Sequence, residues 1–144
     1  MTVEMIEAAI PHRPPMRLLD EVLQREGNQI VCRKTFLADE FFLQGHFPAR
    51  PIVPGVILME CCMQAGAVLL SQLHPLGEGF LPLATRADNV KFKNQVGPGD
   101  SVEIEVRLQD QVANAYFLTG RVVLKGKLAT RLDFACTLAA TEST

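Results

Sequence analysis

The chain has 144 residues, which is enough for a hydrophobic core, and we expect a single domain over residues 1–144. Hydrophobic residues make up 48% and charged residues 21% of the chain, a composition that excludes an intrinsically disordered protein. The formal net charge of −2 gives no basic excess, so we expect no nucleic-acid partner.

Cysteine and histidine spacing gives no sign of a metal centre, because there is no Cys-x-x-Cys pair and no histidine cluster. The four cysteines are Cys32, Cys61, Cys62 and Cys136. Adjacent cysteines in an apolar stretch behave as small hydrophobic residues, so we expect reduced core thiols and a cytoplasmic protein. The first residues include Glu4 and Glu7 and lack the basic segment of a signal peptide.

The first part of the chain predicts a short helix, a hairpin and a proline-rich loop. Val3, Ile6, Ala9 and Ile10 recur at helical spacing, and Glu4 and Glu7 lie on the other side of the expected helix. The elements expected in order are a helix over residues 3–10 that Pro11 ends, strands over 17–25 and 28–37 joined around Gly27, one helical turn over 39–43 with Asp39 as its cap, and a loop over 44–53.

A nearly all-apolar helix is expected over residues 54–73, and Glu60 is its only carboxyl group. Pro54 suits the first turn, where its missing N–H costs nothing, and Pro75 disfavours helix in the residue before it. The stretch approaches the length of a membrane span, but Glu60 and Gln64 near its middle are unfavourable in lipid. We therefore expect a helix buried inside protein and no membrane span.

The rest of the chain is strand-like, most clearly over residues 101–109, where Val102, Ile104, Val106 and Leu108 alternate with polar and charged residues. The expected strands cover residues 81–92, with interruptions at Pro82 and at 86–89, then 101–109, 113–124 and 128–138, and the tail over 139–144 is expected to be frayed. A helix that is apolar on every face needs a sheet on one side and a cover on the other. No further element of the chain supplies that cover, so we expect a homodimer.

Four residues around the start of this helix suggest a catalytic site. His46 lies in a loop stiffened by prolines and is suited to removing a proton near neutral pH. The N–H of Gly55, in the first helical turn, is a donor for an oxygen that gains negative charge. Burial favours the uncharged form of the Glu60 carboxyl group, and Gln64 shares its helix face. Singly, such residues are more often structural, but together they favour a site.

These residues resemble a known signature. The segment Gly45-His46-Phe47-Pro48-x-Arg50-Pro51-x-x-Pro54-Gly55-Val56, followed by Glu60 and Gln64, is similar to that of the FabZ-type 3-hydroxyacyl-acyl-carrier-protein dehydratases. Further similarity lies in Pro11-His12-Arg13, Leu18-Leu19-Asp20-Glu21-Val22, Asp88-Asn89-Val90-Lys91-Phe92-Lys93 and Val96-Gly97-Pro98-Gly99-Asp100. The resemblance implies an α+β hot-dog fold, in which a curved antiparallel sheet of about five or six strands wraps a long central helix and the chain dimerises.

The resemblance also implies roles for single residues. His46 and Glu60 would be the catalytic pair, base and acid, contributed by opposite subunits of a homodimer, with trimers of such dimers as a further assembly. Gly55 would donate its N–H to the thioester oxygen. Gln64, Phe47 and Ile52 would line the substrate site, whereas His12 and Arg13 match a motif that we interpret as structural.

The implied reaction removes water from a (3R)-3-hydroxyacyl group and gives the trans-2-enoyl product, in fatty acid or related polyene or polyketide biosynthesis. The acyl group would arrive on the phosphopantetheine of an acyl carrier protein, and no cofactor or metal is expected. The cations expected to contact an acidic carrier are Arg13, Arg17, Arg86, Lys91 and Lys93. The stretch from Leu81 to Arg86 lacks the aromatic residue with which the family often gates its acyl tunnel, so the preferred chain length stays open.

Two other functions remain open at this stage. A hot-dog thioesterase or a hydratase of coenzyme A thioesters would share the fold, because function resides in the site and not in the fold. A non-catalytic acyl-binding subunit is of a different class, and it has no need for His46 and Glu60 together. That pair favours the dehydratase.

Overall fold

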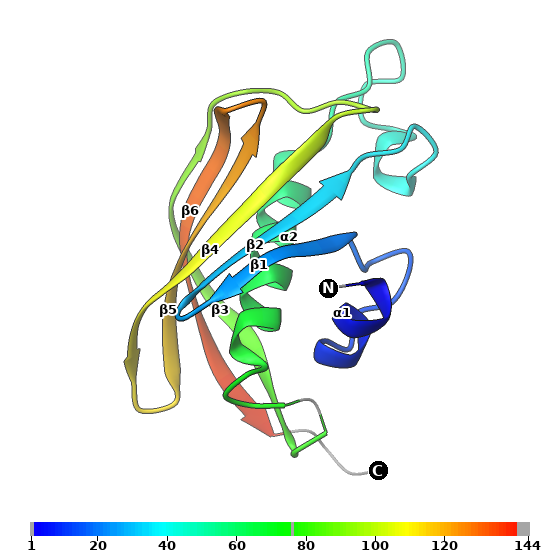
Figure 1. Cartoon of the computed structure of the whole chain (residues 1–144). Coiled ribbons are helices and arrows are strands. Elements are labelled where there is room, and N and C mark those ends of the chain that lie inside the picture. Colours follow the sequence, from blue (N-terminus) through cyan, green and yellow to red (C-terminus); the bar gives the residue numbers. More distant parts are fainter. Residues whose placement is uncertain (1, 76, 141–144) are drawn as a thin grey trace.

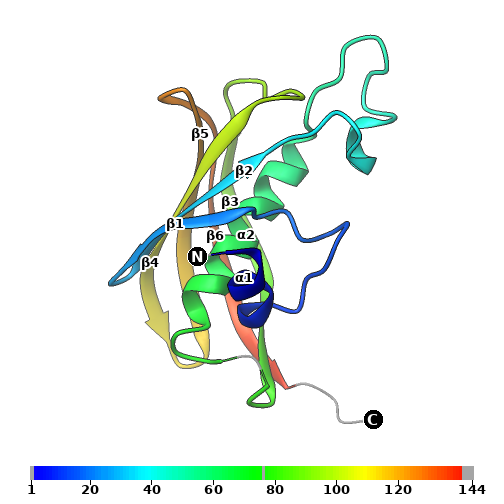
Figure 2. The same ribbon diagram turned by 45° about the vertical axis from the view of Figure 1, so that its right-hand side comes forward.

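The computed structural model describes residues 2–75 and 77–140. The helices are α1 (Val3–Ala9), the short 3-10 helix η1 (Phe41–Leu43) and α2 (Gly55–Leu70). The strands are β1 (Glu21–Glu26), β2 (Gln29–Thr35), β3 (Phe80–Phe92), β4 (Ser101–Val112), β5 (Ala115–Leu124) and β6 (Lys127–Ala140). All strand pairs are antiparallel and the sheet order is β1-β2-β4-β5-β6-β3. The sheet curves around α2, which confirms the hot-dog arrangement (Figures 1 and 2).

Helix α2 packs closely against the sheet because small residues let the two backbones approach. A Cβ atom on Gly120 of β5 would lie 2.8 Å from Cys62 Cβ, and one on Gly66 would lie 3.0 Å from the Phe134 ring. Pro54 has an extended backbone and is the N-cap, and the helix ends at Leu70, three residues earlier than expected. Within the described residues, no helix is long and apolar enough to cross a membrane.

The first hairpin is shorter than its sequence suggests. β1 begins at Glu21, so the expected strand start at Arg17 is wrong. The chain before it is held by Asp20, whose N–H donates to Arg33 O at 2.9 Å and whose Oδ2 accepts from the Thr35 N–H at 2.7 Å. Asx side chains often bind the backbone in this way instead of continuing a ladder.

The expected cap Asp39 is also wrong, since the N-cap of η1 is Glu40. The Glu40 carboxylate accepts hydrogen bonds from the Lys34 Nζ at 2.6 Å and from the Leu37 N–H at 2.9 Å. This pairing explains how Lys34, on the core face of β2, can be buried, because a buried charge needs a partner.

β3 runs through the expected interruptions at Pro82 and at 86–89, with register shifts near Arg86 and between Asp88 and Lys91. It pairs with β6 on one side, and within the described residues its other edge has no strand partner. Ala139 and Ala140 pair with Leu81 and Phe80, so they are not frayed as expected. Residues 141–144 lie outside the described residues.

Candidate functional site

Glu60 lies on α2 with one carboxylate oxygen held by its own helix. The Gln64 Nε2 donates to Glu60 Oε2 at 2.9 Å, as the spacing of four residues predicts. Gln64 is buried and fixed in turn, because its Nε2 donates to Met16 O at 2.7 Å and its Oε1 accepts from the Leu18 N–H at 2.9 Å. The amide therefore cannot rotate without losing three bonds, and Glu60 is held in one orientation.

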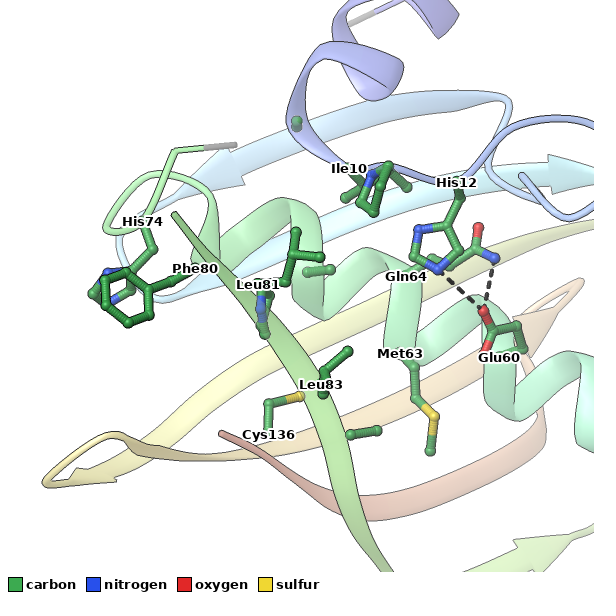
Figure 3. Close-up of a pocket in the computed structure, with 15 residues that line it drawn as sticks. Ile10, His12, Glu60, Met63, Gln64, His74, Phe80, Leu81, Leu83 and Cys136 are labelled. Carbon is green, nitrogen blue, oxygen red and sulfur yellow. Dashed lines mark hydrogen bonds and ion pairs between the residues drawn. The ribbon is translucent and has the colours of Figure 1, made fainter. Parts of the chain in front are cut away.

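His12 reaches the same oxygen from a different part of the chain. Its Nε2 lies 3.6 Å from Glu60 Oε2, and its Nδ1 is buried without a hydrogen-bond partner among the described residues. Figure 3 shows His12 and Gln64 on the same side of the Glu60 carboxylate. Sequence reasoning treated His12 as structural and missed this contact. The Pro11-His12-Arg13 motif was the only signal for it.

A pocket of about 220 Å³ opens beside Glu60 and His12. Its apolar wall comes from α2, from the start of β3 and from the C-terminal half of β6, and includes Met63, Ala67, Leu81, Leu83 and Cys136 (Figure 3). At the far end lies His74, whose Nε2 is hydrogen-bonded to the buried Tyr116 hydroxyl. The volume exceeds the 150 Å³ or so of an apolar cavity that holds benzene, so it can take part of an acyl chain.

His46 lies in the loop that precedes α2, and its ring has a defined tautomer. Nδ1 is 2.8 Å from Ile52 O. Because a carbonyl oxygen only accepts, Nδ1 carries the proton, and the neutral ring then has a free lone pair on Nε2. The Phe47 ring centroid is 4.2 Å from that of His46, and Phe47 itself has a positive φ of 65° and is exposed. His46 is therefore able to accept a proton at Nε2.

A second pocket joins His46 to the first turn of α2 and includes Ile52, Gly55 and Phe92. Within the described residues, the Gly55 N–H donates to no acceptor, as is usual for the first N–H groups of a helix. A side chain at position 55 would collide with Phe92, since an added Cβ would lie 2.4 Å from Phe92 Cε1. Glycine at this position therefore lets the Phe92 ring lie directly against the first turn of the helix.

The structure thus forms two groups of the expected site residues. Gln64 lies with Glu60 in the first pocket, and Ile52 and Gly55 lie with His46 in the second. His46 does not line the first pocket of its own chain.

The expected carrier-binding cations differ in how they are engaged. Arg13 and Arg17 both contact the Glu7 carboxylate, at 3.6 and 2.9 Å, and both donate to backbone carbonyls. Arg86 pairs with Asp88 at 2.5 Å. Lys91 and Lys93 have no ion pair within residues 2–75 and 77–140.

The cysteines carry no sign of an activated nucleophile. Burial raises the pKa of the Cys32 thiol to about 12 and that of Cys136, in the pocket wall, to about 11. Burial also raises the pKa of Cys61 and Cys62 far above the usual range. All four are free thiols, and a catalytic cysteine needs the opposite shift. Among the residues that the structure describes, no three His, Cys, Asp or Glu side chains are grouped so as to hold a metal ion.

Solved structures share this architecture. The dehydratase heterocomplex ApeI:P from Xenorhabdus doucetiae matches with a TM-score of 0.80 at 19% identity, over 94% of this chain and 91% of that chain. A hypothetical thioesterase with coenzyme A from Streptococcus pneumoniae TIGR4 matches with a TM-score of 0.67 at 12% identity, over 85% and 88%. At these identities the matches show the hot-dog fold alone.

Sequence comparison is more specific. The 3-hydroxyacyl-[acyl-carrier-protein] dehydratase FabZ of Xanthomonas oryzae pv. oryzae (strain PXO99A) is 37% identical over 142 residues, covering 95% of this chain and 92% of that protein. The protein of the same name from Streptococcus pyogenes serotype M1 is 39% identical over 139 residues, covering 94% and 99%. Residues 10–133 also match the family of FabA-like domains. The chain therefore belongs to the FabA-like family, with FabZ-type dehydratases as its relatives.

Proposed function

We propose that the protein dehydrates (3R)-3-hydroxyacyl groups carried on an acyl carrier protein and releases the trans-2-enoyl product. The observation that supports this proposal most is the position of Glu60. Gln64 holds its Oε2, and it lies beside a pocket with an apolar wall. With Oε2 held as an acceptor, the acid proton belongs on Oε1, which is left for the substrate. The relatives are 3-hydroxyacyl-[acyl-carrier-protein] dehydratases, which supports this substrate class.

The reaction divides between the two pockets. His46 Nε2 takes the proton from C2 of the substrate, and the C2–H electron pair forms the C2–C3 double bond. The C3–O bond breaks, and Glu60 gives its proton to the departing hydroxyl group, which leaves as water. The Gly55 N–H at the positive end of α2 stabilises the negative charge that develops on the thioester oxygen. Gln64 holds the acid, and the Ile52 carbonyl oxygen holds the base by accepting a hydrogen bond from its Nδ1–H.

This division requires a second copy of the chain, and we propose a homodimer in which His46 of one subunit faces Glu60 of the other. The unpaired edge of β3 supports it, since long exposed edges invite pairing with another chain. Exposed apolar side chains follow the same edge, namely Phe80, Leu83 and Phe92. Val56 on α2 is also exposed.

We further propose that the carrier protein contacts the end of β3 near Lys91 and Lys93. Both are exposed and unpaired in the described residues, and they flank Phe92, which lines the pocket at Gly55. Arg13 and Arg17 are less suited, because their guanidinium groups are engaged within the chain.

The test is to incubate the purified protein with 3-hydroxyacyl carrier proteins of several chain lengths and to follow loss of water by mass. We expect enoyl product, and we expect its loss in His46→Ala and Glu60→Gln. A thiol-reactive dye run in parallel detects a thioesterase, because that reaction releases free thiol. Thiol release without enoyl product would refute the dehydratase. Coenzyme A thioesters of the same acyl groups test the carrier preference.

A further inference from the structure

The contact between His12 and Glu60 joins segments 48 residues apart and has no part in the mechanism above. His12 follows α1 and lines the pocket beside Glu60, with Nε2 at 3.6 Å from Oε2. Its backbone is fixed by Arg13, whose Nη1 donates to His12 O at 2.7 Å and to Ile10 O at 2.9 Å. Since Arg13 also pairs with Glu7, the loop that presents the imidazole is tied to α1.

The surroundings of the ring indicate where its proton lies. His12 Nδ1 is buried and has no hydrogen-bond partner in the described part of the chain. A buried N–H without an acceptor costs about 1–3 kcal/mol, and more if the group is charged. The neutral ring with its proton on Nε2 avoids this cost, and it places the N–H on the nitrogen that is nearer to Glu60 Oε2. A cationic ring would place a proton on both nitrogens.

From this geometry we infer that His12 is a positioning residue for the acid Glu60. The inference rests on the proposed function. The Gln64 amide donates to Oε2 at 2.9 Å and the neutral His12 ring lies beside the same oxygen, with Nε2 at 3.6 Å, so Oε1 is left to carry the acid proton toward the substrate. Neutral donors suit a group that must be protonated before each turnover, because a cation there would favour the carboxylate. His12 acts only through Glu60 and does not touch the reacting atoms.

Two variants of similar polarity separate positioning from a general structural role. His12→Gln extends an amide nitrogen to the place of Nε2, whereas His12→Asn holds one near the place of Nδ1, too short to reach Oε2. We expect His12→Asn to lower kcat about 10-fold with KM nearly unchanged, because Glu60 loses the polar group that lies 3.6 Å from its Oε2. His12→Gln should retain most of the wild-type kcat. Equal loss in both variants, or no loss in His12→Asn, would overturn the inference.

A measurement that does not depend on catalysis tests the contact between His12 and Glu60 independently of the proposed function. The chain has three histidines, so ¹⁵N chemical shifts of histidine-labelled protein resolve each ring, and His12→Gln assigns one of them. We expect the proton of His12 on Nε2 and that of His46 on Nδ1. A His12 ring with its proton on Nδ1, or with both nitrogens protonated at neutral pH, would refute the positioning role. A wild-type protein that makes no enoyl product but shows the expected tautomer would refute the dehydratase and keep the contact.

Discussion

His46 and Glu60 line different pockets of one chain, although the proposed reaction needs both at one substrate. His46 lies beside Gly55 in the first turn of α2, and Glu60 lies more than a turn further along, beside His12. In the proposed function, a single chain therefore supplies half of each of two sites. A two-fold dimer that places the His46 of each subunit opposite the Glu60 of the other would form two complete sites, since such an interface pairs unlike parts of identical chains twice.

Mixing two inactive variants tests this pairing. When His46→Ala and Glu60→Gln chains are unfolded together and refolded, about half of the dimers contain one chain of each kind. In such a dimer one site has both wild-type residues and the other has neither. We therefore expect about a quarter of wild-type activity, measured as enoyl hydration, from two preparations that are each inactive alone.

The control is each variant refolded with itself, which should stay inactive. If both residues acted within one chain, no mixed dimer would contain an intact site. Activity no greater than that of the separate variants, with mixed dimers present by native mass spectrometry, would exclude the shared site.

Local patterns predicted much of the fold, and their failures have physical reasons. Strand alternation and the proline at the start of α2 depend on neighbours in sequence, so the order of helices and strands was predictable. The predicted strand start at Arg17 and the predicted cap at Asp39 were wrong, because residue type alone does not tell which side chain binds the backbone. Here the side chains of Asp20 and Glu40 do so.

The site shows the same limit. The Glu60–Gln64 bond follows from helical spacing, whereas the contacts of Gln64 with Leu18 and of Glu60 with His12 join residues more than 40 positions apart. Periodicity within a helix carries no information about which distant loop packs against it. Only the resemblance to a family pointed to His12, and it assigned the residue no chemical role.

Gln64 should matter for stability as well as for activity. In Gln64→Leu the buried Leu18 N–H loses its acceptor, and an unsatisfied buried donor costs about 1–3 kcal/mol. We expect the free energy of unfolding in urea to fall by about this amount and kcat to fall as well, because Glu60 Oε2 loses its donor. Gln24→Leu is the matched control. Gln24 is exposed, so its replacement should change stability by less than about 0.5 kcal/mol. An unaltered unfolding midpoint in Gln64→Leu would contradict the buried network.

The carboxylate of Asp133 should make stability depend on pH. Hydrogen bonds from Asn89, above all, and from Thr119, together with the Arg131 guanidinium group, hold the pKa of Asp133 below its ordinary value of 3.8. A lowered folded-state pKa means that the stabilisation is complete above the unfolded value and is lost as the pH falls through the folded value. Urea unfolding should therefore separate wild type from Asp133→Asn at pH 7, and the two curves should converge as the pH falls through the lowered pKa of Asp133. Asp39→Asn, at an exposed carboxyl group without an ion pair in the described residues, should show no such convergence.

Gly55 and Phe92 should be coupled. In Gly55→Ala the new Cβ would lie 2.4 Å from Phe92 Cε1, so the ring must move. It can do so because Phe92 is a half-exposed side chain at the end of β3. We expect stability to change by less than about 1.5 kcal/mol but enoyl hydration to fall, since the displaced ring lines the pocket at His46. Adding Phe92→Ala removes the collision, so the double variant should be more active than the sum of the two single losses predicts. Additive losses would show that the ring does not mediate the effect.

Substitution of Gly120 by alanine should destabilise the protein more than substitution of Gly55, because the atoms around Gly120 cannot move aside. A Cβ there would lie 2.8 Å from Cys62 Cβ and 2.9 Å from its Sγ, between β5 and the buried face of α2. Relief requires the helix to move away from the sheet, and overpacking of this kind costs about 1–3 kcal/mol. We expect Gly120→Ala to lower the thermal midpoint by several degrees, whereas Gly45→Ala, which meets nothing within 4 Å, should leave it unchanged. Equal midpoints for the two variants would mean that α2 does not press against β5 at Cys62.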